Sequence, residues 1–211
     1  MVYNQSFNEL NALIECSNLY YQRGWMYATS GNLSIREASS NEIIITASGK
    51  NKGELAASDF LIVNMKTGKP SVPSNNKPSA ESAIHLAIYQ AFPSAGAVIH
   101  VHTPESAALS YDMRGTEPCR TIPLPNLEML KAFGNFAENP ELSFLSLYNY
   151  GDVGKIANCF SKHSHRSEVP FFLIEHHGLT VWGKNVAEAN KNIEAAQHIL
   201  QVMHLKSHYR K

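Results

Sequence analysis

The chain has 211 residues, of which 44% are hydrophobic and 17% charged, and its 18 basic residues balance its 18 acidic ones. This composition excludes a disordered chain, and the zero formal charge argues against a nucleic-acid-binding protein, whose affinity rests on a basic face. No apolar run approaches the ~20 residues of a membrane-spanning helix, and the N-terminus lacks the layout of a secretory signal. We therefore expect neither a nucleic-acid nor a membrane partner.

The length fits a single domain over residues 1–211, because one hydrophobic core can keep growing up to ~250 residues. The three cysteines, Cys16, Cys119 and Cys159, are odd in number and far apart in the sequence. This pattern is typical of reduced thiols rather than of a disulfide framework. We therefore expect a cytoplasmic protein.

The first half of the chain predicts one long helix followed by strands. Apolar residues recur at helical spacing from Phe7 to Tyr21, and Gly24 ends this helix. Strands are predicted next in residues 31–37, 42–49 and 60–71.

A polar loop then leads into a helix for which Ser79 is the expected N-cap. Its apolar stripe consists of Ile84, Ala87, Ile88 and Ala91. Residues 95–102 predict a central strand, because they form an apolar run without alternation. Another helix is expected to open at Pro104, since proline favours the first helical position.

The second half predicts further helices and a pair of strands. The expected elements are a short helix within 126–138, a helix starting near Asp152, two strands within 170–183, and a closing helix from Val186 to about Tyr209. Strands and helices alternate irregularly, which predicts a mixed α and β class without strict βαβ repetition.

Two histidines stand one residue apart at the end of the predicted central strand. Because alternate strand residues share a face, His100 and His102 are expected to point the same way. Two neutral imidazoles can chelate one divalent ion, and a catalytic zinc site commonly takes three protein ligands. We expect His177 as the third, because Gly178 after it permits a tight turn, whereas His176 should point the other way.

The remaining histidines predict no metal site. His163 and His165 are expected in a polar loop, and His204 and His208 lie one helical turn apart without an acidic partner. His85 lies one turn after Glu81 and is expected to be its neighbour on the helix face.

Three turns could bind an anion through backbone N–H groups, hydroxyls or lysines. They cover residues 29–32, 46–53 and 77–81, the last of which begins a helix. Ordinary turn chemistry explains each of them taken singly. A phosphate site is therefore predicted only if the three turns converge beside the histidines.

Taken in order, these pieces resemble the class II aldolase/adducin superfamily over nearly the whole chain. The matching motifs are Ser30-Gly31-Asn32 with Ser34 and Arg36, Thr46 with Ser48-Gly49, Pro78-Ser79 with Glu81, His100 with His102, and His177-Gly178 with Trp182-Gly183. Five motifs in the same order are far more specific than any one of them. Within the superfamily, the segments 23–37, 45–64, 77–85 and 126–134 resemble bacterial dehydratases of methionine salvage.

The resemblance implies an α/β protein with three layers, in which helices flank a mainly antiparallel central sheet. It also implies a homotetramer with metal sites near the subunit interfaces. By position, one Zn²⁺ per subunit would be bound by His100, His102 and His177. The phosphate of a sugar-phosphate substrate would be bound by Gly31, Asn32, Ser48, Gly49 and Ser79. The aldolases have a second serine where this chain has Ala80, which removes one phosphate hydroxyl.

The activity that the resemblance implies is metal-dependent dehydration of 5-methylthioribulose 1-phosphate to 2,3-diketo-5-methylthiopentyl 1-phosphate. Glu128 falls on the acid/base glutamate of the dehydratases, and Glu81 is the competing carboxylate, as supporting group, transient ligand or second proton carrier. From the residues alone, Glu128 would instead be a surface residue paired with Lys131, three positions on.

Two rival functions fit part of the pattern. A class II sugar-phosphate aldolase or a pentulose-phosphate epimerase would use the same histidines, but residues 48–55 and 127–133 favour the dehydratase. An adducin-like scaffold would not need a metal site, and all three histidines and both glutamates are present here.

Overall fold

The computed structural model describes residues 2–37, 40–112 and 117–208, and it is built around one eight-stranded sheet. The strand order is β3-β2-β1-β4-β8-β7-β6-β5. The strands are β1 (Asn32–Arg36), β2 (Glu42–Thr46), β3 (Phe60–Asn64), β4 (Ala97–Val101), β5 (Cys119–Pro123), β6 (Ser143–Leu147), β7 (Phe171–Ile174) and β8 (Gly178–Gly183). All neighbours pair antiparallel except β6 and β7.

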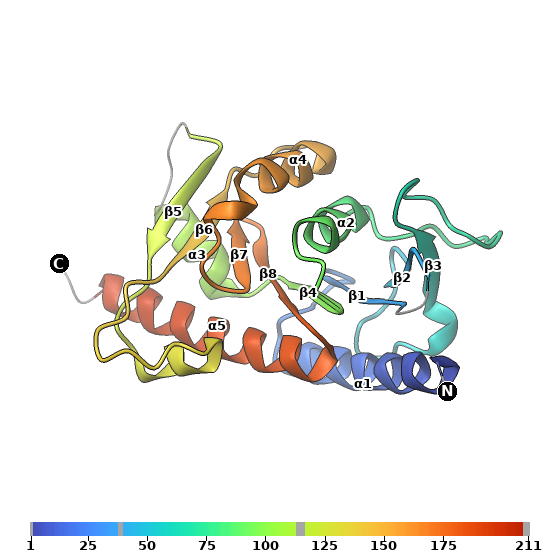
Figure 1. Ribbon diagram of the computed structural model, residues 1–211, viewed down its shortest axis with the longest axis horizontal. Helices are drawn as coiled ribbons and strands as arrows, with labels where there is room; N and C mark the ends of the chain where they lie inside the picture. Colours follow the sequence, from blue (N-terminus) through green and yellow to red (C-terminus); the bar gives the residue numbers. More distant parts are fainter. Residues whose placement is uncertain (1, 38–39, 113–116, 209–211) are drawn as a thin grey trace.

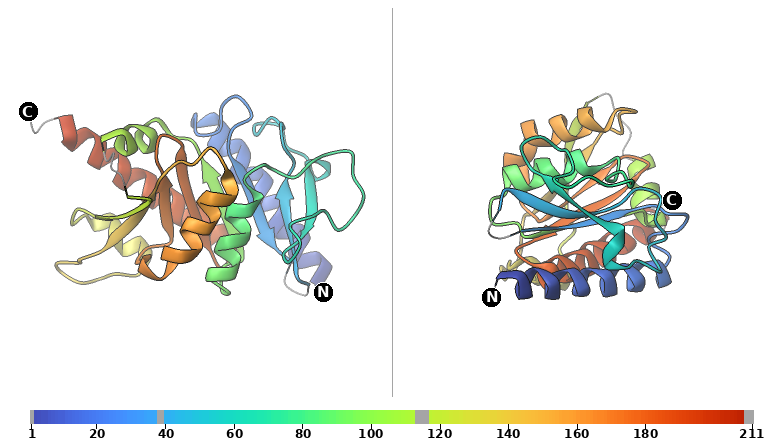
Figure 2. Two further views of the ribbon diagram at one scale, coloured as in Figure 1. Left: turned by 90° about the horizontal axis from the view of Figure 1, so that it is seen from above. Right: turned by 90° about the vertical axis from the view of Figure 1, so that its right-hand side faces the viewer.

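Helices cover both faces of the sheet (Figures 1 and 2). One layer contains α1 (Val2–Gln22) and α5 (Val186–His208), and the opposite layer contains α2 (Ser82–Ala91) and α4 (Val153–His163). Successive residues of β4 alternate between the two cores: Ile99 packs with α1 and α5, whereas Val98 packs with α2 and α4. The predicted three-layer architecture with a mainly antiparallel central sheet is confirmed.

The predicted elements match the structure at most positions. The strand with His100 is central, α3 (Pro104–Asp112) opens at the expected proline, and α4 follows Asp152, whose side chain accepts a hydrogen bond from the Gly154 N–H. The closing helix is described to His208, so Tyr209 lies outside the described residues.

Two details of the prediction need correction. Ser79 is not the N-cap of α2: that place belongs to Glu81, because the Ser79 carbonyl accepts hydrogen bonds from the N–H and hydroxyl of Ser82 and forms a separate turn. The edge strand β5 and its neighbour β6 were also missed. Their pairing is set by tertiary contact, and Pro123 is tolerated because β5 lies at the sheet edge.

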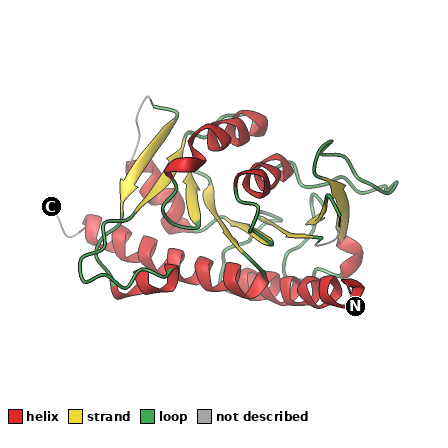
Figure 3. Cartoon of the chain, in the orientation of Figure 1, coloured by secondary structure: helices red, strands yellow, loops and turns green. Residues whose placement is uncertain are grey.

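Two irregular segments bear on the functional site. The connection of residues 65–81, between β3 and α2, is a long loop (Figure 3). The predicted short helix near residue 130 is a 3-10 helix, η2 (Glu128–Phe133), which packs against α5. Within the described residues, no helix is both long and apolar enough to cross a lipid bilayer.

Candidate metal centre

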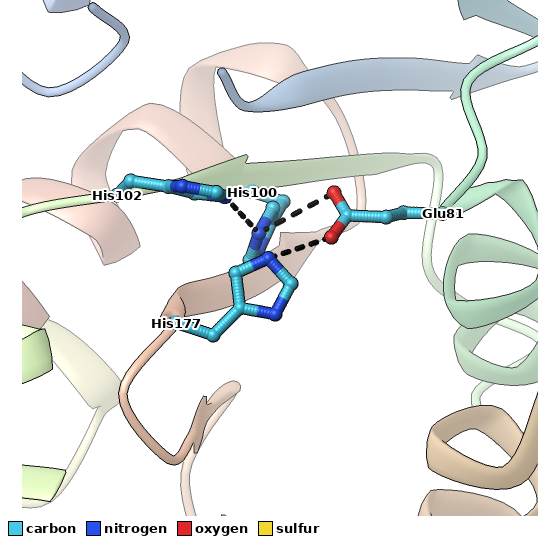
Figure 4. Close-up of side chains that lie close together, drawn as sticks. All are labelled: Glu81, His100, His102 and His177. Atoms are coloured by element: carbon cyan, nitrogen blue, oxygen red, sulfur yellow. Dashed lines mark hydrogen bonds and ion pairs between the residues drawn. The ribbon is translucent and has the colours of Figure 1, made fainter. Parts of the chain in front are cut away.

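Four side chains from distant parts of the chain meet beside the end of β4 (Figure 4). His100 belongs to β4 and His102 follows it, His177 lies in the turn between β7 and β8, and Glu81 immediately precedes α2. Their ligand atoms all lie within 4.8 Å of one another. The structure thus brings the three histidines of the sequence prediction together and adds Glu81 as a fourth donor.

The contacts within this cluster are short. The Nε2 atoms of His100 and His102 are 2.9 Å apart, and the His100 Nε2 lies 3.5 Å from Glu81 Oε2. The His177 Nε2 lies 2.7 Å from Glu81 Oε1. The three ring centroids are 4.6 to 5.0 Å apart, and the rings stand nearly perpendicular to one another.

Strand pairing fixes the orientation of His100. Its neighbours across the sheet are Asn32 on β1 and Thr180 on β8, and its Nδ1 lies 2.8 Å from the Thr180 hydroxyl. With Nδ1–H donating to Thr180, the lone pair of Nε2 faces the cluster. A metal-binding histidine characteristically has such a partner on its other ring nitrogen.

Gly178 is needed for a different reason than the turn predicted from the sequence. The left-handed residue of this turn is His176, with φ of 55°, and its side chain is exposed outside the cluster. A Cβ on Gly178 would lie 2.3 Å from the Val101 carbonyl oxygen and 3.0 Å from the His100 ring. Glycine is therefore required by the close approach of β8 to β4.

The charge state of the cluster suits a divalent cation. Burial lowers the pKa of His100 to about 3 and that of His102 to about 4, so both rings are neutral at pH 7. Burial by itself would raise the pKa of Glu81, but its interactions with His100, His177 and Asn32 outweigh this effect and hold that pKa well below its usual range. Three imidazoles and a carboxylate fit zinc and similar transition metals.

Two of the predicted anion-binding turns are held side by side. The Ser48 N–H donates to the Lys77 carbonyl at 2.9 Å, and the Ser79 N–H donates to the Thr46 carbonyl at 3.2 Å. The Ser79 hydroxyl accepts from the Glu81 N–H at 3.3 Å, which leaves its own hydrogen available to a ligand. A Cβ on Gly49, where φ is 74°, would meet nothing within 4 Å, so there is open space at this turn.

The first turn touches the metal cluster directly. A Cβ on Gly31, where φ is 75°, would lie 2.8 Å from the His100 carbonyl oxygen. The next residue, Asn32, donates from its amide nitrogen to Glu81 Oε2. All three turns therefore converge at the histidines, which was the condition for predicting a phosphate site.

Lys52 is a residue of this region that the sequence did not single out. Its side chain is buried, and its Nζ donates to the carbonyls of Thr29 at 2.7 Å and Lys50 at 2.9 Å, which joins two of the turns. Burial lowers the pKa of Lys52 to about 8, and the charge of Glu81 opposes this shift. No local pattern distinguishes this buried lysine from its exposed neighbours.

Glu128 lies elsewhere. Its carboxylate is 2.7 Å from the Lys131 Nζ, and its side chain is 83% exposed. Leu130 of the same 3-10 helix packs into the core on the α5 side of the sheet, whereas Val98, which shares a strand face with His100, packs on the α2 side. Within one chain, the sheet therefore lies between Glu128 and the histidine cluster.

Comparison with known proteins gives a consistent result. Residues 11–204 match the family described as Class II Aldolase and Adducin N-terminal domain. The chain is 46% identical over 199 residues to methylthioribulose-1-phosphate dehydratase of Leptospira biflexa, covering 92% of this chain and 95% of that protein. It is 41% identical over 204 residues to the protein of the same name from Leptospira interrogans, covering 92% and 82%.

A solved structure extends the likeness to the fold. L-fuculose-1-phosphate aldolase from Thermus thermophilus superposes with a TM-score of 0.71 at 22% identity, covering 96% of this chain and 97% of that one. Family match, relatives and fold agree over nearly the whole length. The chain belongs to the class II aldolase and adducin family.

Proposed function

We propose that the protein is a metal-dependent dehydratase of methionine salvage, converting 5-methylthioribulose 1-phosphate to 2,3-diketo-5-methylthiopentyl 1-phosphate. The observation that carries this proposal is the cluster of Glu81 with three histidines, beside which three anion-binding turns converge. The names of the Leptospira relatives support the choice of substrate, at 46% and 41% identity.

We assign the metal site to His100, His102 and His177, with Zn²⁺ as the expected ion. A bound ion supplies positive charge that stabilises the negative charge developing on the C2 oxygen of the ketose when C3 loses its proton. Thr180 holds the ring of His100, and Glu81 contributes a negative charge between His100 and His177. In this arrangement Glu81 is a supporting group of the metal site.

The substrate phosphate is assigned to the converging turns. The hydroxyls of Ser48 and Ser79 are the expected donors, because the N–H groups of both residues already bind backbone carbonyls. Gly31, Asn32 and Gly49 complete this phosphate site, and open space lies at Gly49. Lys52 adds a positive charge that holds the turns together.

We assign the proton transfer to Glu128. Its carboxylate takes the proton from C3 and delivers it to the departing C4 hydroxyl, and the resulting enol tautomerises to the diketone. Because the sheet separates Glu128 from the histidines of its own chain, we place it at the cluster of a neighbouring copy in a homotetramer. The exposure of Glu128, and of Phe136 close by at 74%, supports a contact surface in this segment. The free thiols of Cys16, Cys119 and Cys159 fit the expected cytoplasmic location.

A product assay tests this function against its rivals. Purified protein with Zn²⁺ and 5-methylthioribulose 1-phosphate is expected to form the diketone, to stop after chelation, and to recover when zinc is restored. Release of an aldehyde would identify an aldolase, and inversion of a hydroxyl without loss of water an epimerase. Either of these products in place of the diketone overturns the proposal.

A further inference from the structure

A chain of buried polar groups leads from Glu81 into the interface between β1 and α2. Asn32 donates to Glu81 through its amide nitrogen, and its Oδ1 lies 2.5 Å from the His85 Nε2. On the far side of the ring, the Ser34 hydroxyl lies 2.7 Å from the His85 Nδ1 and 2.9 Å from the Tyr89 hydroxyl. His85, Ser34, Tyr89 and Asn32 are all at most 2% exposed.

The available hydrogen atoms fix which group donates and which accepts at each hydrogen bond of this series. The ionised carboxylate of Glu81 can only accept, so Asn32 must present its NH₂ group to Glu81 and its carbonyl oxygen to His85. The His85 Nε2 must then carry the hydrogen. Burial lowers the pKa of His85 to about 4, so the ring is neutral and its Nδ1 accepts from the Ser34 hydroxyl.

Tyr89, the last residue of this hydrogen-bonded series, is also held in place. The Tyr89 hydroxyl donates towards Ser34, whose hydroxyl and carbonyl oxygens lie at 2.9 and 3.1 Å. Arg36 stacks over the Tyr89 ring at 4.9 Å and donates from Nη2 to the Tyr89 carbonyl at 2.5 Å. The position of the His85 ring is therefore fixed from both sides.

This polarity matters because an asparagine amide can turn over. In the reversed orientation the Asn32 carbonyl oxygen would face the Glu81 carboxylate and repel it, while the NH₂ group would face the Nε2–H of His85. Two like pairs would then be buried without a hydrogen bond, and an unsatisfied buried polar group is unfavourable. The hydrogen on the His85 Nε2 selects the orientation in which both pairs are satisfied.

We infer that His85 is a positioning residue of the metal centre, which acts through Asn32 to keep the Glu81 carboxylate turned towards His100 and His177. Ser34 and Tyr89 fix the His85 tautomer from behind. This inference rests on the proposed metal site and extends it to residues that touch neither metal nor substrate.

Two matched substitutions test the inference. In His85→Gln the longer amide can place an N–H near the position of Nε2, so the donor to Asn32 is kept. In His85→Asn the shorter amide reaches only the Nδ1 position and leaves Asn32 without its donor. The readouts are zinc affinity of the metal-free protein by competition with a chromophoric chelator, kcat and KM with 5-methylthioribulose 1-phosphate, and thermal unfolding.

His85→Asn is expected to weaken zinc binding and to lower kcat by about 10- to 100-fold, the usual effect of losing a group that orients a metal ligand. KM should change by less than about threefold. His85→Gln should stay within about threefold of the wild type in both zinc affinity and kcat. A purely structural role predicts instead that both variants lower the unfolding temperature together and keep the zinc affinity of their folded fraction. That result, or wild-type zinc affinity in His85→Asn, overturns the inference.

Ser34→Ala provides a second route if His85→Asn does not fold. It removes only the hydroxyl that fixes the tautomer, and it is expected to weaken zinc binding by about tenfold. Wild-type zinc affinity in this variant also counts against the inference. Failure of the proposed function looks different, because the wild-type protein would then bind zinc no better than His177→Ala or would form no diketone.

Discussion

The regions around Glu81 and Glu128 differ in how much of each is built within one chain. Glu81 is largely buried and meets His100, His177 and Asn32, which are contributed by β4, the β7–β8 turn and β1. Glu128 stands on the surface, and its partner is Lys131 of the same short helix. The proposed metal ligands thus meet within one folded chain, whereas our proposal needs a second copy of the chain to bring Glu128 to them.

The largest expected effect comes from removing one of the proposed metal ligands. His177→Ala removes one of three imidazoles, and we expect loss of bound zinc and a fall in turnover of about 10⁴-fold, since the ion's charge is worth several kcal/mol. His176→Ala is the matched control, because that neighbouring ring is exposed and lies outside the cluster. Zinc content after dialysis and initial rates measure the difference. Equal losses in the two variants contradict the assignment of His177.

Glu128→Gln tests the proposed role of Glu128 in proton transfer. Turnover should fall about 10³-fold, within the range for a general acid–base group, while zinc content stays at the wild-type level. A variant that retains near-full turnover removes Glu128 from the mechanism.

Mixed assemblies then show which chain supplies Glu128. When Glu128→Gln and His177→Ala chains are co-expressed, random pairing should restore about a quarter of the wild-type sites if each site draws on two chains. The measurement is the turnover of the mixed oligomer against each variant purified separately. No recovery means that Glu128 acts within its own chain.

We expect the metal-free protein to lose stability in acid because of buried histidines in the Glu81 region. Burial lowers the pKa values of His85 and His102 to about 4 and that of His100 to about 3, below the unfolded value of about 6.5. Between these values the unfolded chain binds more protons, so the stability of the metal-free protein falls as pH drops from about 6.5 towards 4. Each imidazole contributes about 1 kcal/mol per pH unit.

Urea denaturation of chelator-treated protein at pH 7, 6 and 5 measures this slope. A pH-independent stability over this range is incompatible with three neutral buried rings.

The smallest expected effect concerns Lys52, which joins two turns of the Glu81 region. Lys52→Met keeps an unbranched aliphatic side chain but removes the ammonium group. KM should rise about tenfold, which corresponds to the loss of one charge-assisted hydrogen bond. Zinc content should not change. Lys50→Met is the control, because Lys50 pairs near the surface with Asp59 at 2.9 Å, and its KM should stay within about twofold. Equal KM values in the two variants remove Lys52 from phosphate binding.

Much of the fold and the cluster could be predicted because their signals are local. His100 and His102 occupy alternate positions in an apolar strand, and His177 precedes a glycine between two strands. The contacts of Lys52 and His85 could not be predicted, because they arise only when β1 packs beside α2 and the turns close. The edge strand β5 and its neighbour β6 were missed for the same reason, since their pairing is decided by neighbours far away in sequence.

The absence of a side chain at Gly178 has a consequence for the whole metal cluster. With the Val101 carbonyl oxygen only 2.3 Å from where a methyl carbon would stand, even alanine would force β8 away from β4. His177 directly precedes Gly178, and the His100 ring lies 3.0 Å from the same Cβ position, so this displacement would move two of the proposed ligands apart. The spacing of the proposed metal ligands therefore depends on the absence of a side chain at Gly178.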